Sequence, residues 1–134
     1  MTAFSLKIVT PYGLVYDGSA EEVIVRTTTG DMGVLANHIN CVAPLGMGRA
    51  TIVIDGQKRF AACIGGMLSV VDGKVTLVPT TFEWADQIDV ERAEASYQKA
   101  QAVLSEKSNS QADIRLAEAR LKRALVRKSV AQFR

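Results

Sequence analysis

Residues 88–93, IDVERA, place a carboxylate and a guanidinium three positions apart, where the chain stops using glycine and proline. Asp89 suits a helix N-cap, because its carboxylate can accept a backbone N–H from the first turn. Ile88 can then pack on Ala93, four positions after the cap. A cation in the first turn is unfavourable beside the positive end of the helix dipole. The motif therefore predicts a helix start at Asp89, and it favours a second role for Arg92.

No other residues suggest a catalytic or metal centre. His38 is the one histidine, so a multi-histidine metal site is excluded, and no nucleophile with an orienting acid accompanies it. Cys41 and Cys63 make neither a disulfide framework nor a metal cluster, and we expect both to be small buried residues. Gly30 and Gly33 lack the spacing and the Lys-Ser/Thr pair of a phosphate loop, so we expect a turn there. We therefore do not expect an enzyme.

Glycine, proline and charge divide the chain near residue 84. All ten glycines and all three prolines lie between Pro11 and Pro79. Residues 1–84 carry six Lys/Arg and seven Asp/Glu, a net charge of −1, whereas residues 85–134 carry ten and seven, a net charge of +3. Because glycine and proline mark turns and weaken helices, the sequence predicts a β domain over 1–84 and a helical domain over 85–134.

The first half has the pattern of short antiparallel strands. Runs rich in Val, Ile and Thr recur about every ten residues without helical segments between them, which is typical of a sandwich or a flattened barrel. Asp55-Gly56 and Asp72-Gly73 join such runs, and Asp-Gly readily adopts the positive φ of a tight hairpin turn. The Gly65-Gly66 pair predicts a bulge or a tight bend before the next strand.

The second half has the pattern of a helical hairpin. Apolar residues follow a helical repeat in two segments, Ala93, Tyr97, Ala100 and Leu104 in the first and Ile114, Ala117, Leu121 and Ala124 in the second. Residues 105–110 are the expected turn. These stripes are narrow and rich in alanine, so the two-helix hairpin should be only marginally stable by itself.

The chain has no apolar run of about 18 residues, so we expect no membrane span, and residues 1–10 do not resemble a secretory signal.

The last twenty residues are strongly basic, with seven Lys/Arg and Glu118 as the only acid. One interpretation is a solvated basic face, and the other general interpretation is nucleic-acid binding. Nucleic-acid binding is disfavoured, because the segment has no interleaved aromatic residues and no recognisable DNA- or RNA-binding motif.

Several segments in order resemble one known family. They are IVTPYGLVYDGSAEEVIVRTTTGDMGVLANH near the start, APL at 43–45, GGMLSV at 65–70, KVTLV at 74–78, IDVERA at 88–93 and LKRALVR in the second predicted helix. Together they are similar to the ε subunit of bacterial F-type ATP synthase over essentially the whole chain. The resemblance implies a β-sandwich of about ten strands followed by an antiparallel two-helix hairpin.

The resemblance also implies function. The protein would be a non-catalytic subunit of the rotor stalk that couples the γ subunit to the c-ring and inhibits ATP hydrolysis through an ATP-sensitive helical domain. It would lie peripherally on the cytoplasmic face of the cell membrane, within the F1 sector. No catalytic cofactor is implied, only regulatory ATP, and nucleic acid is not an expected partner. The alternative hypothesis is a free-standing β-sandwich adaptor whose basic helical tail binds an acidic protein surface.

Three groups of residues carry these implied roles. Regulatory ATP would contact Glu83, Ile88, Asp89, Arg92, Ala93, Arg123 and Arg127. The surface facing γ and the c-ring would include Asp31 and His38. An inhibitory basic helix, which meets acidic loops of the catalytic β subunits when extended, would present Arg115, Arg120, Lys122, Arg123, Arg127 and Lys128. Leu116 stands where some ATP-binding members have an arginine, which lowers the expected phosphate affinity.

Overall fold

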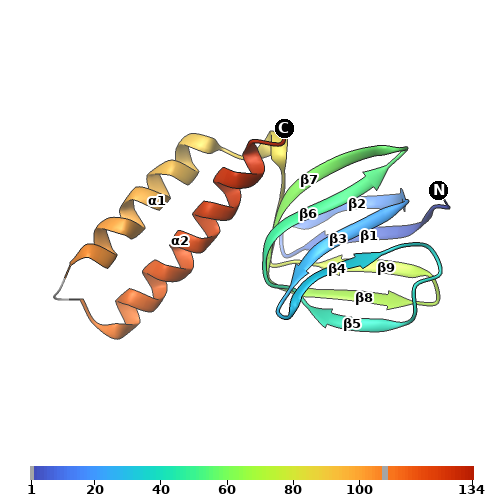
Figure 1. Ribbon diagram of the computed structural model, residues 1–134, viewed down its shortest axis with the longest axis horizontal. Coiled ribbons are helices and arrows are strands. Elements are labelled where there is room, and N and C mark those ends of the chain that lie inside the picture. Colours follow the sequence, from blue (N-terminus) through green and yellow to red (C-terminus); the bar gives the residue numbers. More distant parts are fainter. Residues whose placement is uncertain (1, 107–108) are drawn as a thin grey trace. The chain divides into compact units, whose positions relative to one another are not determined.

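A computed structural model describes residues 2–106 and 109–134 of the chain. The chain divides into two compact units, the first ending at Trp84 and the second beginning at Ala85. Figure 1 shows strands in the first unit and helices in the second. Neither helix found among the described residues is long and apolar enough to cross a membrane.

The first unit is a β-sandwich of two five-stranded sheets. The strand orders are β2-β1-β9-β8-β5 and β10-β7-β6-β3-β4. The described strands are β1 (Phe4–Thr10), β2 (Gly13–Ala20), β3 (Glu22–Thr27), β4 (Gly30–Val34), β5 (Cys41–Pro44), β6 (Met47–Ile54), β7 (Gln57–Ile64), β8 (Met67–Val71), β9 (Lys74–Val78) and β10 (Thr81–Trp84). The predicted sandwich is therefore confirmed.

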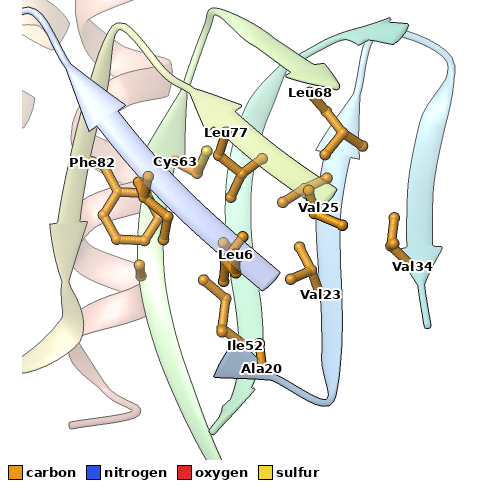
Figure 2. Close-up of a cluster of buried hydrophobic side chains, with 14 of the residues drawn as sticks. Leu6, Ala20, Val23, Val25, Val34, Ile52, Cys63, Leu68, Leu77 and Phe82 are labelled. Carbon is orange, nitrogen blue, oxygen red and sulfur yellow. The ribbon is translucent and has the colours of Figure 1, made fainter. Parts of the chain in front are cut away.

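The sandwich core comes from period-two alternation in both sheets. In β1, Phe4, Leu6 and Ile8 are buried while the residues between them are exposed or half-buried. Figure 2 shows Leu6 and Leu77 from one sheet near Ile52 from the other. Side chains of a strand alternate between its two faces, so each sheet contributes one apolar face to a shared interior.

Both predicted Asp-Gly hairpins are present. Asp55 and Gly56 have φ of 52° and 76°, and Asp72 and Gly73 have φ of 49° and 79°. They join β6 to β7 and β8 to β9, which are antiparallel pairs. One feature differs from the expected antiparallel pattern, because β1 pairs with β9 in parallel. These two strands are far apart in sequence, so no local turn motif predicts that they pair.

The predicted bend at Gly65-Gly66 has a steric cause. Gly65 and Gly66 have φ of 69° and 95°, which side-chain-bearing residues rarely adopt. A Cβ on Gly66 would lie 2.0 Å from the carbonyl oxygen of Val78. The chain can therefore cross the end of β9 at this point only because Gly66 has no side chain.

The second unit is the predicted helical hairpin. A 3₁₀ turn, η1 (Ala85–Gln87), precedes the helices α1 (Val90–Ser105) and α2 (Gln111–Ala131). Figure 1 shows α1 and α2 side by side. The predicted turn over 105–110 is one residue too long at its start, because Ser105 ends α1. Residues 107 and 108 of that segment lie outside the described residues.

The Gly66 crossing gives a sharp test with a matched control. Gly73→Ala should cost about 1–2 kcal/mol, because its φ is unfavourable for alanine but nothing lies within 4 Å of the added Cβ. Gly66→Ala should cost about 3 kcal/mol or more, because a backbone clash adds to the same φ penalty. Urea unfolding followed by fluorescence of Trp84, the one tryptophan, measures the β unit. Equal losses for both variants would contradict the steric explanation.

Candidate functional site

The IDVERA segment starts α1 as predicted. Asp89 has φ −79° and ψ 97°, and its Oδ1 accepts the backbone N–H of Arg92 at 3.0 Å. Its carbonyl oxygen accepts the backbone N–H of Ala93, also at 3.0 Å. Ile88 and Ala93 are both buried, as a hydrophobic staple requires. The cap therefore uses one carboxylate oxygen of Asp89 and only the backbone of Arg92.

Alanine makes up most of the buried seam between the helices. Ala93 and Ala100 are the buried residues of α1, and Ala117 and Ala124 are buried on α2. The larger members of the predicted stripes are half-buried, namely Tyr97, Leu104, Ile114 and Leu121. Alanine lets two helices approach closely but removes little apolar area from water. The prediction of a thin seam is therefore confirmed.

A cleft of about 420 Å³ runs along one side of this seam. Its lining residues are Ser96, Lys99, Ala100 and Val103 from α1, Asn109 before α2, and Asp113, Leu116, Ala117 and Arg120 from α2. A shallower depression lies on the other side, lined by Gln98, Gln101, Ala102, Leu104, Ser105 and Leu121. No charged side chain lines the second depression, whereas two cations and one carboxylate line the first. The two sides of the hairpin therefore differ in charge.

The arginines of the candidate ATP site extend the charged side of the hairpin. Arg92 precedes Ser96 by four positions, so it shares the row of α1 that lines the cleft. Arg123 and Arg127 follow Arg120 by three and seven positions, so they continue the corresponding row of α2. Because the helices are antiparallel neighbours, the end of α2 lies beside the start of α1. The fold thus brings these three arginines to the same side and the same end of the hairpin.

Leu116 lines the cleft with about half of its side chain exposed. It follows Arg115 and stands one turn before Arg120. Arg120 and Lys99 both line this part of the cleft, so cations remain there even though Leu116 is apolar. An anion in the cleft would therefore still meet a positive potential near Leu116.

A different set of contacts ties the helices together beside the seam. Lys128 Nζ lies 2.6 Å from Glu94 Oε2 and 4.2 Å from the centre of the Tyr97 ring. Gln98 Nε2 donates a hydrogen bond to Glu94 Oε1 at 2.9 Å. Hydrogen bonds from Gln98 and then Lys128 hold the pKa of Glu94 below its ordinary value. Glu94 is therefore a charged carboxylate at neutral pH, and it joins α1 to a cation of α2.

The proposed inhibitory cations are not equivalent in this hairpin. Arg115, Arg120 and Lys122 are exposed, whereas Arg123, Arg127 and Lys128 are half-buried. Lys128 already contacts Glu94 and the ring of Tyr97. An acidic surface would therefore have immediate access to the exposed cations of α2 but would have to compete for Lys128.

The two candidate interface residues lie in the β unit. Asp31 of β4 faces Arg26 of β3 as a cross-strand partner, and their side chains form an exposed ion pair at 2.6 Å. His38 is half-buried in the segment between β4 and β5, and its Nδ1 donates to the carbonyl oxygen of Ile39 at 2.8 Å. Each of the two side chains therefore has a local partner.

Glu83 lies in the β unit rather than in the hairpin. It is half-buried on β10, opposite Ala62 of β7. The other six candidate ATP contacts all belong to the helical unit.

The two cysteines differ in burial. Cys63 is buried, as expected, and burial raises the pKa of its thiol to about 12. Cys41 is half-buried on β5, so the expectation of a fully buried residue is wrong there. It stands at an edge of its sheet, where only one neighbouring strand covers it.

Two structural features of the hairpin were not predicted from the sequence. Ser110 caps α2, its Oγ accepting the backbone N–H of Asp113 at 3.2 Å. A Ser-x-x-Asp signal for this cap was present within the predicted turn. The Glu94–Lys128 pair had no comparable signal, because a contact between two helices depends on how they are aligned along their axes.

Comparison with known proteins gives a consistent result over both units. The family model described as the ATP synthase delta/epsilon chain beta-sandwich domain matches residues 3–85. The model described as the ATP synthase delta/epsilon chain long alpha-helix domain matches residues 86–132. The ATP synthase epsilon chain of Caldanaerobacter subterraneus subsp. tengcongensis is 41% identical over 129 residues, covering 96% of this chain and 93% of that protein. The epsilon chain of Bacillus velezensis is 44% identical over 131 residues, covering 98% of each.

Solved structures show the same fold at lower sequence identity. A chain of the Euglena gracilis mitochondrial ATP synthase OSCP/F1/c-ring structure is 23% identical, with a TM-score of 0.83. The match covers all of this chain and 83% of that one. A chain of the Tetrahymena thermophila mitochondrial ATP synthase central stalk/c-ring structure is 13% identical, with a TM-score of 0.62 and 95% coverage of both chains. At these identities the likeness supports the fold alone.

The two roles of the IDVERA segment can be separated by substitution. Asp89→Ala should destabilise the helical unit by about 1 kcal/mol, because it removes the N-cap. Arg92→Ala should leave helix content unchanged, because only its backbone serves the cap and alanine favours helix. Thermal unfolding followed by far-ultraviolet circular dichroism measures both effects. Ser110→Ala is the matched control and should resemble Asp89→Ala, since it removes the equivalent cap of α2. A loss for Arg92→Ala as large as that for Asp89→Ala would contradict the assignment.

Proposed function

The chain belongs to the ATP synthase delta/epsilon chain family, and we propose that it is a rotor-stalk subunit whose helical hairpin regulates ATP hydrolysis. As a member of this family it is an accessory, non-catalytic subunit of ATP synthase. A free-standing adaptor is the weaker alternative, because the two family models together match residues 3–132.

The β unit, residues 1–84, is the proposed docking domain for the γ subunit and the c-ring. Asp31 and His38 are the proposed contact residues; Asp31 is exposed beside Arg26, and His38 is half-buried beside the carbonyl oxygen of Ile39. The protein would then lie peripherally at the cytoplasmic face of the membrane as part of the F1 sector. Cysteines introduced at 31 and 38 should crosslink to γ or the c-ring in the assembled enzyme. Crosslinks only to peripheral-stalk subunits would contradict this placement.

The helical unit, residues 85–134, is the proposed regulatory domain, with ATP as its ligand. The observation that carries this proposal is the gathering of cations on one side of the hairpin. Arg92 and Lys99 of α1 share that side with Arg120, Arg123 and Arg127 of α2. Asp113 is the only acid among the residues that line the cleft. Guanidinium groups suit phosphate oxygens, because their planar forks can donate two parallel hydrogen bonds.

Each proposed contact has a chemical role. Arg92, Arg123 and Arg127 would bind the phosphates from both helices. Asp89 would recognise the nucleoside through the carboxylate oxygen that does not accept the cap hydrogen bond. Ile88 and Ala93 would contribute apolar surface at the start of α1. Glu83, the remaining candidate, belongs to the β unit and would have no role in binding the phosphates.

ATP would regulate the hairpin by binding its folded form. Residues from both α1 and α2 meet the phosphates only when the helices lie together, so the ligand discriminates between closed and open states. At a hundredfold excess over the dissociation constant, binding contributes about 2.7 kcal/mol. This contribution is large beside a seam built mostly of alanine.

Calorimetric titration of ATP into the full-length protein tests the site. The wild type should bind, and Arg92→Ala should weaken binding about tenfold or more, because it removes a charge-assisted hydrogen bond to phosphate. Lys122→Ala is the matched control, since it removes a cation of α2 that points about 200° away from Arg120 at about 100° per residue. Its affinity should stay within about twofold of the wild type. No binding by the wild type at millimolar ATP would contradict the proposed site.

The basic α2 helix is the proposed inhibitory element. When the hairpin extends, its cations would meet acidic loops of the catalytic β subunits, in keeping with seven Lys/Arg against one acid in the last twenty residues. Deleting residues 111–134 should raise ATP hydrolysis by the assembled enzyme. The control is the subunit stoichiometry of the purified complex, which should not change. Unchanged hydrolysis at normal stoichiometry would contradict an inhibitory role.

A further inference from the structure

Lys128 has two competing uses in this protein. In the folded hairpin its Nζ lies 2.6 Å from Glu94 Oε2 and 4.2 Å from the centre of the Tyr97 ring. In the proposed extended state it is one of the cations of α2 that would meet an acidic surface. The same ammonium group cannot make both sets of contacts fully, so the internal contacts limit the external ones.

The groups around Glu94 favour its contact with the ammonium group of Lys128. Its second carboxylate oxygen accepts a hydrogen bond from Gln98 at 2.9 Å, which fixes the carboxylate on α1. Tyr97 is three positions before Ala100 and four after Ala93, so its ring stands on the seam. An ammonium group over a tyrosine face and beside a carboxylate is attracted by both. The side chains of Lys128 and Glu94 are 32% and 44% exposed, so water screens their attraction only in part.

We propose that Glu94, Tyr97 and Lys128 form a clasp that holds the hairpin closed and withholds the Lys128 cation from the acidic partner surface. The masking part of this proposal, that the clasp withholds Lys128 from the partner, rests on the proposed inhibitory role of α2. The closing part, that the clasp holds the two helices together, does not depend on that role. In the closed hairpin, Lys128 binds the carboxylate of Glu94 instead of a carboxylate on the acidic partner surface. Opening the hairpin breaks the clasp and releases Lys128, so opening and exposure of this cation occur together.

The clasp acts separately from the candidate ATP site. At about 100° per residue, Glu94 and the cleft-lining Lys99 project to opposite sides of the Ala93–Ala100 seam. Arg92 also lies on the Lys99 side. The clasp therefore sets the balance between open and closed hairpins even when no nucleotide is bound.

Hydrogen exchange of the full-length protein without nucleotide tests the closing part. Amides of α1 and α2 exchange when the hairpin opens, so the exchange rate follows the open fraction. Glu94→Gln and Lys128→Gln should each speed exchange about two- to fivefold, the range expected for a partly exposed ion pair. The double variant should exchange no faster than Lys128→Gln alone, because both substitutions break one interaction. Lys122→Gln is the control and should leave the rate unchanged.

Hydrolysis by the assembled enzyme tests the masking part. Both variants open the hairpin, but Glu94→Gln releases the cation whereas Lys128→Gln removes it. Glu94→Gln should therefore lower ATP hydrolysis relative to wild type, and Lys128→Gln should give higher hydrolysis than Glu94→Gln.

The outcomes separate the two claims. Wild-type exchange rates in Glu94→Gln would overturn the clasp. Faster exchange with equal hydrolysis in the two variants, in an enzyme that deletion of 111–134 does activate, would overturn the masking. If that deletion has no effect, the proposed function fails, and the exchange rates still decide whether the clasp exists.

Discussion

The alanine seam between α1 and α2 sets the energy scale for the contact between these two helices. Its fully buried members are Ala93 and Ala100 facing Ala117 and Ala124, and methyl groups remove little apolar area from water. Helices of 16 and 21 residues are marginal in isolation, so their stability depends on what they pack against. A single weak contact would be minor in a large core, but it can matter in a hairpin with so small a seam.

The β unit shows the opposite balance. Its two sheets enclose Leu6, Ile8, Ile52, Leu68 and Leu77, all nearly inaccessible to solvent (Figure 2). Such side chains each contribute about 1.5–3 kcal/mol when fully buried, so this core does not depend on a single peripheral contact. A rigid unit suits a constant docking role, whereas a marginal hairpin suits a part that changes state. The chain places large apolar residues in one unit and alanine in the seam of the other, which fits the proposed division between a docking unit and a regulatory unit.

Local patterns in the sequence predicted much of this structure. Asp55-Gly56 and Asp72-Gly73 predicted the two hairpins, the glycine and proline distribution predicted where strands give way to helices, and Asp89 predicted the start of α1. The missed features are long-range. The parallel β1–β9 pair and the Glu94–Lys128 clasp both depend on which residues become neighbours after folding. Likewise, helical spacing alone showed that Arg123 and Arg127 share a face, but placing Arg92 beside them required the antiparallel arrangement of the helices.

The two sides of the hairpin can act on the same equilibrium without touching each other. On the cleft side, Arg92, Lys99, Arg120, Arg123 and Arg127 place cations from both helices along one face, where the proposed anionic ligand would bind them. Across the seam, Glu94 and Lys128 attract each other and favour closure in the absence of a ligand. Under the proposed function, a polyanion bound on the cleft side would favour closure, and an acidic protein surface would favour opening by competing for Lys128. Both proposed effectors would act through charge, and a seam this small would let either of them decide the state.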